Sequence, residues 1–128
     1  MSLISHLLGK DAEVAAEQLL RRKGYTILDR NVRFGRGELD IVARIGETLV
    51  FVEVKARRTD HYGGVFHAVT AHKERQLIHL AAQYLAHHQC TQYACRFDVI
   101  LYDATTPGAP VLEHIEHAFE VSGDDLRW

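Results

Sequence analysis

Two carboxylates and a lysine interrupt an apolar stretch of the sequence, GELDIVARIGETLVFVEVK, which covers residues 37–55. Asp40 lies in its first half, and Glu53 and Lys55 interrupt a second half that otherwise reads as a buried strand. Glu53 and Lys55 are two positions apart, so they share a face of that strand. Charged side chains in a buried strand are costly unless they are paired or bound to a metal. Two interpretations therefore stay open, a site for a hard cation and a network of cross-strand ion pairs.

The cation interpretation gives each of these residues a chemical task. Mg²⁺ prefers oxygen ligands and keeps several of its waters, so two carboxylates and a backbone carbonyl can hold it. A cation held in this way makes water a better nucleophile and polarises a phosphoryl oxygen. We therefore expect Asp40 and Glu53 to bind Mg²⁺ or Mn²⁺, and Lys55 to orient the water or to stabilise the charge that develops.

The turn between the two halves decides whether the carboxylates meet. Gly46-Glu47 fits a two-residue type II′ loop, whose first position favours glycine. A three-residue loop would instead place Asp40 and Glu53 on opposite faces of the sheet. Facing Cβ atoms lie about 5 Å apart across a strand pair. The facing pairs that the two-residue loop predicts are Ile45 with Thr48, Asp40 with Glu53, and Glu38 with Lys55.

Helices and strands must position these residues, and their order predicts a mixture of both. Strand alternation places Leu39, Ile41 and Ala43 on one face, and Glu38 and Asp40 on the other. Gly24 is a typical residue after a helix end, and Thr70 is a typical N-cap. The predicted helices cover residues 9–23 and about 70–88, and the predicted strands cover 25–33, 38–44, 48–55, 96–102 and 111–119.

Length and composition limit the class of protein. The chain has 128 residues, which predicts one domain over 1–128, with a core over about 9–119 and an exposed tail over 120–128. No apolar run reaches the roughly 18 residues of a membrane span. The N-terminus does not read as a signal peptide. Cys90 and Cys95 are the only cysteines, which predicts reduced thiols and a cytoplasmic protein.

The net charge of −2 conceals an uneven distribution of charge. Residues 21–58 contain ten Lys/Arg and five Asp/Glu and carry +5, whereas the other residues contain five and twelve and carry −7. A basic segment around an acidic pocket suits a substrate with a phosphate backbone. The alternative is that these side chains are scattered over several faces. The predicted nucleic-acid contacts are Arg33, Arg36, Arg57, Arg58 and Lys73.

The order of a helix glutamate, an aspartate and an E-V-K motif resembles the core of the PD-(D/E)xK nuclease superfamily. More closely, the chain resembles the bacterial YraN family over about residues 9–119. GELD followed by FVEVK, which sets Asp40 and Glu53 thirteen positions apart, is the more specific part of this resemblance. The other residues that carry it are Glu13, Ala16, Leu20, Lys23-Gly24-Tyr25, Ile27-Leu28, Arg30-Asn31, Arg57-Arg58, Lys73, Arg96-Phe97-Asp98-Val99 and His114-Ile115.

The resemblance implies an α/β, restriction-endonuclease-like fold with a central mixed β-sheet flanked by α-helices. It also implies Mg²⁺-dependent cleavage of phosphodiester bonds, with Asp40 and Glu53 as metal ligands, Lys55 acting on water, and Glu13 completing the site from the first helix. The arrangement is similar to that of archaeal Holliday-junction resolvases, which act as dimers. Glu38 has no assured role in the superfamily and is interpreted as a partner of Lys55.

The function expected from these observations is a metal-dependent endonuclease that acts on DNA, with branched or otherwise structured DNA as one candidate substrate. The alternative is a non-catalytic nucleic-acid-binding module with a nuclease-like fold. A homodimer is one expected state, although no residue of the sequence marks an interface. No membrane partner is expected.

Overall fold

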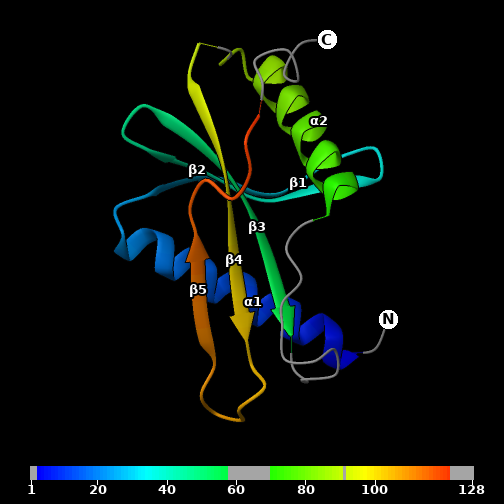
Figure 1. Cartoon of the computed structure of the whole chain (residues 1–128), viewed down its shortest axis with the longest axis vertical. Helices are drawn as coiled ribbons and strands as arrows, with labels where there is room; N and C mark the ends of the chain where they lie inside the picture. The colour runs from blue at the N-terminus through cyan, green and yellow to red at the C-terminus, as the bar shows by residue number, and fades with distance from the viewer. Residues whose placement is uncertain (1–2, 58–69, 91, 122–128) are drawn as a thin grey trace.

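The computed structural model describes residues 3–57, 70–90 and 92–121. These residues form two helices and a five-stranded sheet (Figure 1). The elements are α1 (Leu3–Arg22), β1 (Thr26–Phe34), β2 (Gly37–Ile45), β3 (Thr48–Arg57), α2 (Ala71–His87), β4 (Ala94–Asp103) and β5 (Val111–Ile115). Within the described residues, no helix combines the length and the apolar character that crossing a bilayer requires.

The sheet is mixed, with the strand order β1-β2-β3-β4-β5. The β3–β4 pair is parallel, and the other neighbouring pairs are antiparallel. A parallel pair needs a long crossover connection, which here contains α2. The expected fold class, α/β with a mixed sheet and flanking helices, is confirmed.

The helices cover opposite faces of the sheet, with α1 behind it and α2 in front of it in Figure 1. Alternate residues of β3 show the division, because Phe51 packs in a cluster with α2 residues and Val52 packs in a cluster with α1 residues. Each helix therefore buries a stripe against the sheet. In α1 this stripe is Ala12, Ala16 and Leu20, at a spacing of four residues, and all three are buried.

The register of the β2–β3 hairpin is the predicted one, with Ile45 opposite Thr48 and Ile41 opposite Val52. Gly46 has φ 58°, and Glu47 is not among the described non-glycine residues with positive φ. This combination fits a type II′ turn and excludes type I′, which needs positive φ at both positions. The ladder ends at Ile41–Val52, so the two predicted pairs nearest the candidate site lie beyond it.

The predicted alternation of faces along β2 is wrong at one point. Leu39 packs in the α2 cluster, whereas Ile41 and Ala43 pack in the α1 cluster. The change occurs at Asp40, where the ladder to β3 ends and the Asp40 side chain takes the N–H of Val54. The Asp40 carboxylate thus takes the place of a backbone carbonyl as the acceptor of the Val54 N–H. The regular alternation of faces along β2 is interrupted at this residue.

Several element boundaries differ from the prediction. The first helix begins at Leu3 rather than at residue 9. The last strand ends at Ile115 rather than at Phe119, because His117 has φ 52° and donates its N–H to the Asp98 carboxylate instead of to a strand. Thr70 is the N-cap of α2, as predicted, and its hydroxyl oxygen accepts the Lys73 N–H at 3.2 Å.

The expected tail also differs from the structure. Val121 packs against the α2 cluster, so the packed part of the chain continues two residues beyond the predicted core limit of residue 119. Residues 122–128 lie outside the described residues.

Candidate metal centre

Asp40 lies where β2 and β3 stop pairing with each other. Its Oδ2 accepts the Val54 N–H at 2.8 Å, which fixes the carboxylate between the two strands. Burial, followed by the negative charges of Glu53, Glu13 and Glu38, raises the pKa of Asp40 to about 8, although the Val54 hydrogen bond opposes the rise. A carboxylate in such surroundings is stabilised when it binds a proton or a cation.

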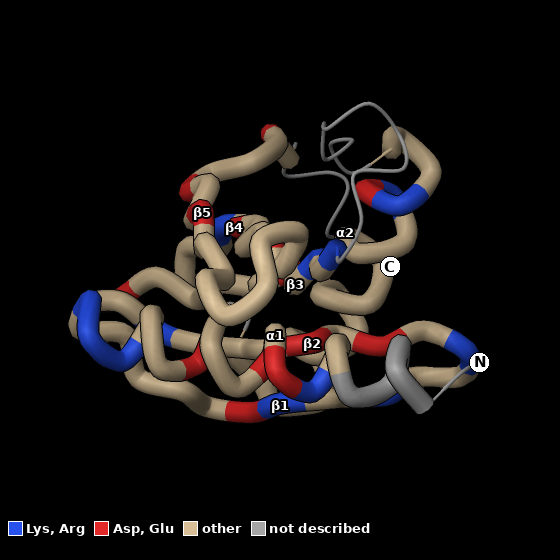
Figure 2. Tube along the Cα trace, turned by 90° about the horizontal axis from the view of Figure 1, so that it is seen from below, with Lys and Arg blue, Asp and Glu red and all other residues tan. Residues whose placement is uncertain are grey.

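Three carboxylates from two elements converge at this point. Glu13 of α1, together with Glu38 and Asp40 of β2, can each offer one oxygen, and these oxygens lie within 4.8 Å of one another. Glu13 reaches the sheet because the neighbouring Ala12 and Ala16 are small and bring the helix axis close to it. Figure 2 shows acidic positions of α1 and β2 side by side in the view along the sheet.

Glu53 of β3 interacts with Asp40. Its side chain is 12 % exposed, and its Oε1 lies 3.7 Å from Lys73 Nζ on α2. Its Oε2 is buried and has no hydrogen-bond partner among the residues that the structure describes. Burial raises the pKa of Glu53, while the charges of Lys73 and Lys55 and a hydrogen bond with Asp40 oppose that rise. Asp40 therefore joins Glu53 to the group formed by Glu13 and Glu38.

This donor set fits a hard divalent cation. All its members are carboxylates, the ligands that Mg²⁺ and Mn²⁺ prefer. Buried polar atoms normally have a partner, and Oε2 of Glu53 has none within the described ranges of the chain. The crowding of four carboxylates is also costly without a neutralising charge.

The structure brings together most of the predicted site residues. Glu13 and Asp40 share one carboxylate cluster, Glu53 interacts with Asp40, and the charge of Lys55 acts on Glu53. The predicted pairing of Glu38 with Lys55 is wrong. Glu38 instead accepts a hydrogen bond from Asn31 at 3.2 Å and forms an ion pair with Arg33 at 3.1 Å.

The reason lies in the neighbouring strand. Glu38 is opposite Arg33 in the β1–β2 ladder, which continues past the point where β2 and β3 separate. Glu38 is therefore a candidate ligand that was not predicted from the sequence. A signal was present in GELD, because Glu38 and Asp40 are two positions apart and can share one face of a strand.

The predicted nucleic-acid contacts have different surroundings. Arg33 and Lys73 form ion pairs with Glu38 and Glu53 of the site itself. Arg57 is held by Asp103 of β4 at 2.8 Å and is only 21 % exposed, so it ties two strands together. Arg36 is exposed in the turn between β1 and β2. Arg58 lies outside the described residues.

A pocket of about 230 Å³ opens over the carboxylates between α1 and the β1–β2 part of the sheet. Its basic residues are Lys10 and Arg30, neither of which was predicted as a contact. They come from separate elements and become neighbours only through packing, so no local motif marks them. The residues that line the pocket are Lys10, Glu13, Val14, Glu17, Arg30, Asn31, Asp40 and Ile41.

Comparison with known proteins gives a protein family and a distant structural similarity. The model of the uncharacterised protein family UPF0102 matches residues 12–102. A UPF0102 protein of Geobacter sulfurreducens is 47% identical over 91% of each chain. One from Geobacter metallireducens is 46% identical over 95% of this chain and 99% of that protein. One from Symbiobacterium thermophilum is 44% identical over 91% of this chain and 98% of that protein.

Among solved structures, Pyrococcus furiosus SfsA in complex with Ca²⁺ is similar with a TM-score of 0.42 and 15% sequence identity. The match covers 91% of this chain but only 65% of SfsA.

Proposed function

The chain belongs to the UPF0102 family, the YraN family that its sequence resembles, and we propose that it is a metal-dependent endonuclease that hydrolyses phosphodiester bonds in DNA. The observation that carries this proposal is the convergence of carboxylates from α1, β2 and β3 on Asp40. A packed fold tolerates such crowding poorly unless a cation offsets it.

The cation in this proposal is Mg²⁺ or Mn²⁺. Asp40 and Glu53 would hold it, and Glu13 and Glu38 would complete the set of oxygen ligands. When bound, a hard divalent cation would act as a Lewis acid that polarises a phosphoryl oxygen and activates water. The buried, unpartnered Oε2 of Glu53 supports its inclusion among the ligands.

The other residues of the site have complementary tasks. Lys55 orients the attacking water or stabilises negative charge that develops on the phosphate. Lys10 and Arg30 line the pocket above the carboxylates and bind the phosphates of the DNA backbone. In the reaction, an oxygen from water bonds to phosphorus, the bond to one ester oxygen breaks, and the leaving oxygen takes a proton.

One observation favours a second candidate, a module that binds nucleic acid without cutting it. Lys73 lies 3.7 Å from Glu53, and both Lys73 and Lys55 stabilise the charged form of that carboxylate. The fold thus supplies part of the neutralising charge from its own side chains. This candidate predicts salt-sensitive binding without turnover in any divalent metal.

A cleavage assay over duplex, single-stranded and four-way-junction DNA distinguishes the two candidates. We expect nicking with Mg²⁺ or Mn²⁺, none in excess chelator, and loss of nicking to background in Asp40→Ala. Glu47→Ala is the matched control, because it removes an exposed carboxylate in the β2–β3 turn and should leave cleavage unchanged. Metal-dependent nicking that survives in folded Asp40→Ala would contradict the proposed site.

A further inference from the structure

Asn31 of β1 lies against the carboxylates of the candidate metal centre. Resting on the proposed function, we propose that Asn31 is a positioning residue that holds Glu13 of α1 and Glu38 of β2 in the orientation that binds the cation. Its side chain acts through these two carboxylates. Neither the matched family model nor the relatives' names assign it a role.

The backbone of Asn31 is unusual for a strand residue. It has φ 52°, in the left-handed region, which asparagine tolerates better than most other residues. It lies between the ladder pairs Arg30–Ile41 and Val32–Leu39, and is therefore across from Asp40. The strand keeps its register on both sides, but its faces exchange at this residue, because Arg30 lies at the pocket beside α1 and Val32 packs against the α2 cluster.

The contacts of the Asn31 amide join two elements. Its Nδ2 donates to both carboxylate oxygens of Glu13, at 3.3 and 3.2 Å, and to Oε1 of Glu38 at 3.2 Å. Within the described part of the chain, Glu13 has no other hydrogen bond or ion pair, whereas Glu38 also contacts Arg33. The orientation of Glu13 therefore depends on Asn31.

The chemistry of an amide suits this task. A lysine or arginine in the same place would bring a positive charge and compete with a divalent cation for the carboxylates. The Asn31 amide donates hydrogen bonds without adding charge, and each carboxylate oxygen keeps a lone pair for another partner. Loss of such an outer hydrogen bond at a metal site typically weakens metal affinity by about 10–100-fold.

The test compares Mn²⁺ binding by isothermal titration calorimetry in the full chain and its variants. Asn31→Gly removes the amide, and glycine adopts the same positive φ without strain. Gln89→Gly is the matched control, because Gln89 has φ 54° and lies beyond the end of α2. We expect about 10–100-fold weaker Mn²⁺ binding in Asn31→Gly and wild-type affinity in Gln89→Gly, with native circular dichroism in both.

A double variant asks whether Asn31 acts through Glu13. If it does, Asn31→Gly should weaken binding less in a Glu13→Gln background than in the wild type. Unchanged or tighter Mn²⁺ binding in Asn31→Gly would overturn the inference alone. Wild-type protein that binds no Mn²⁺, or binds it as Asp40→Ala does, would instead overturn the metal centre on which the inference rests.

Discussion

Asp40 is a carboxylate that the fold holds in unfavourable surroundings. It is enclosed between β2 and β3, accepts the N–H of Val54, and has Glu13, Glu38 and Glu53 as neighbours. Burial and the neighbouring negative charges outweigh the Val54 hydrogen bond, so the pKa of Asp40 rises to about 8. Ionisable residues whose pKa is strongly shifted by burial and neighbouring charges are typical of functional sites.

The raised pKa of Asp40 predicts a loss of stability with rising pH. In the unfolded chain Asp40 loses its proton near pH 4, because the ordinary pKa of an aspartate is about 3.9. In the folded protein Asp40 keeps its proton until about pH 8. The folded state therefore binds one more proton across this range, and the free energy of unfolding of the metal-free protein falls as pH rises.

Asp40→Asn should remove this dependence and leave the variant more stable than the wild type at pH 8. We expect a gain of up to about 5 kcal/mol, because the pKa of Asp40 rises from 3.8 to about 8 and a change of one in pKa corresponds to about 1.4 kcal/mol. Urea unfolding in chelator at pH 5 and pH 8 measures both effects. A wild-type stability that rises from pH 5 to pH 8 relative to Asp40→Asn would contradict the assigned surroundings of Asp40.

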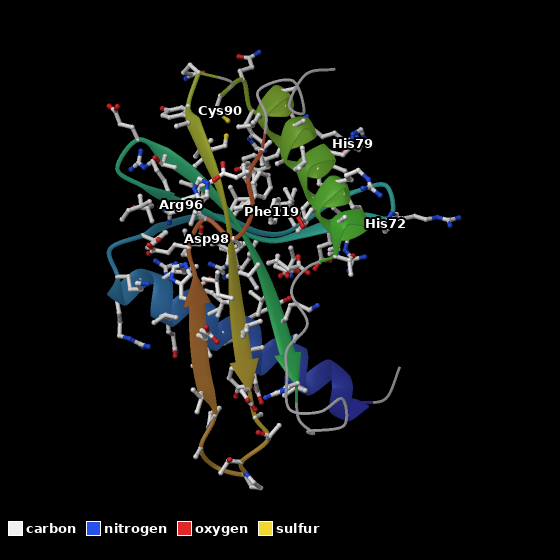
Figure 3. The ribbon with its side chains drawn as sticks, viewed as in Figure 1. His72, His79, Cys90, Arg96, Asp98 and Phe119 are labelled. Atoms are coloured by element: carbon white, nitrogen blue, oxygen red, sulfur yellow. The ribbon has the colours of Figure 1, made fainter. Side chains whose placement is uncertain are left out.

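At the scale of elements, a second polar group joins the end of α1 to β4 and β5. Asp98 of β4 has a fully buried side chain, which accepts hydrogen bonds from Arg96, from the His114 ring at 2.8 Å and from the His117 N–H at 3.1 Å. His114 in turn contacts Lys23 at 2.7 Å, just beyond α1. Figure 3 shows Arg96 and Asp98 together on β4, with Phe119 between β4 and α2.

Both carboxylate oxygens of Asp98 accept hydrogen bonds, which fix the arrangement of this polar group. Burial by itself raises the pKa of Asp98, but the hydrogen bonds from His114, Arg96 and His117 outweigh it and lower the pKa. The same contacts explain why β5 ends early, since the turn at His117 faces Asp98.

Asp98→Ala should destabilise the protein by about 3–5 kcal/mol, because it leaves the buried partners of a charge uncompensated. The exposed Glu113→Ala on β5 is the control and should change stability by less than about 0.5 kcal/mol. Thermal unfolding followed by circular dichroism gives both values. An Asp98→Ala variant as stable as the control would show that this group does not hold α1, β4 and β5 together.

The hairpin and the second helix could be predicted from the sequence because a few neighbouring residues determine each of them. Gly46-Glu47 sets the β2–β3 register, and Thr70 sets the start of α2. The partners of Glu38 and the change of face after Leu39 depend instead on where two strands separate. No short stretch of the sequence determines these two features, because they depend on how α1 and β1 pack against β2.

At the scale of the whole molecule, the fold distributes its charges more evenly than the sequence suggested. Several basic residues of the +5 segment pair with acids, among them Arg30 with Glu17 and Lys23 with Glu116. Figure 2 shows Lys and Arg positions at both ends of the molecule as well as near α1 and β1. Lys10 and Arg30 are the basic residues that line the pocket, and Arg30 is also paired with Glu17 at its wall.

Lys10→Gln and Arg30→Gln should each weaken DNA binding and reduce its salt dependence. The loss of one phosphate contact lowers the slope of log K against log [salt] by about 0.9 for duplex DNA. Arg22→Gln is the control, because Arg22 is an exposed residue at the other end of α1. Fluorescence anisotropy in Ca²⁺ at several salt concentrations measures the slope. Equal slopes for all three variants would place the DNA elsewhere.

A crystal structure of the protein soaked in Mn²⁺ tests the central claim most directly. Anomalous scattering locates Mn²⁺ without assumptions about its ligands. The account predicts a Mn²⁺ peak bonded to Asp40 and to at least one of Glu13, Glu38 and Glu53, and no such peak in Asp40→Ala. Crystals that bind Mn²⁺ only elsewhere, or that bind none at saturating concentration, would contradict it.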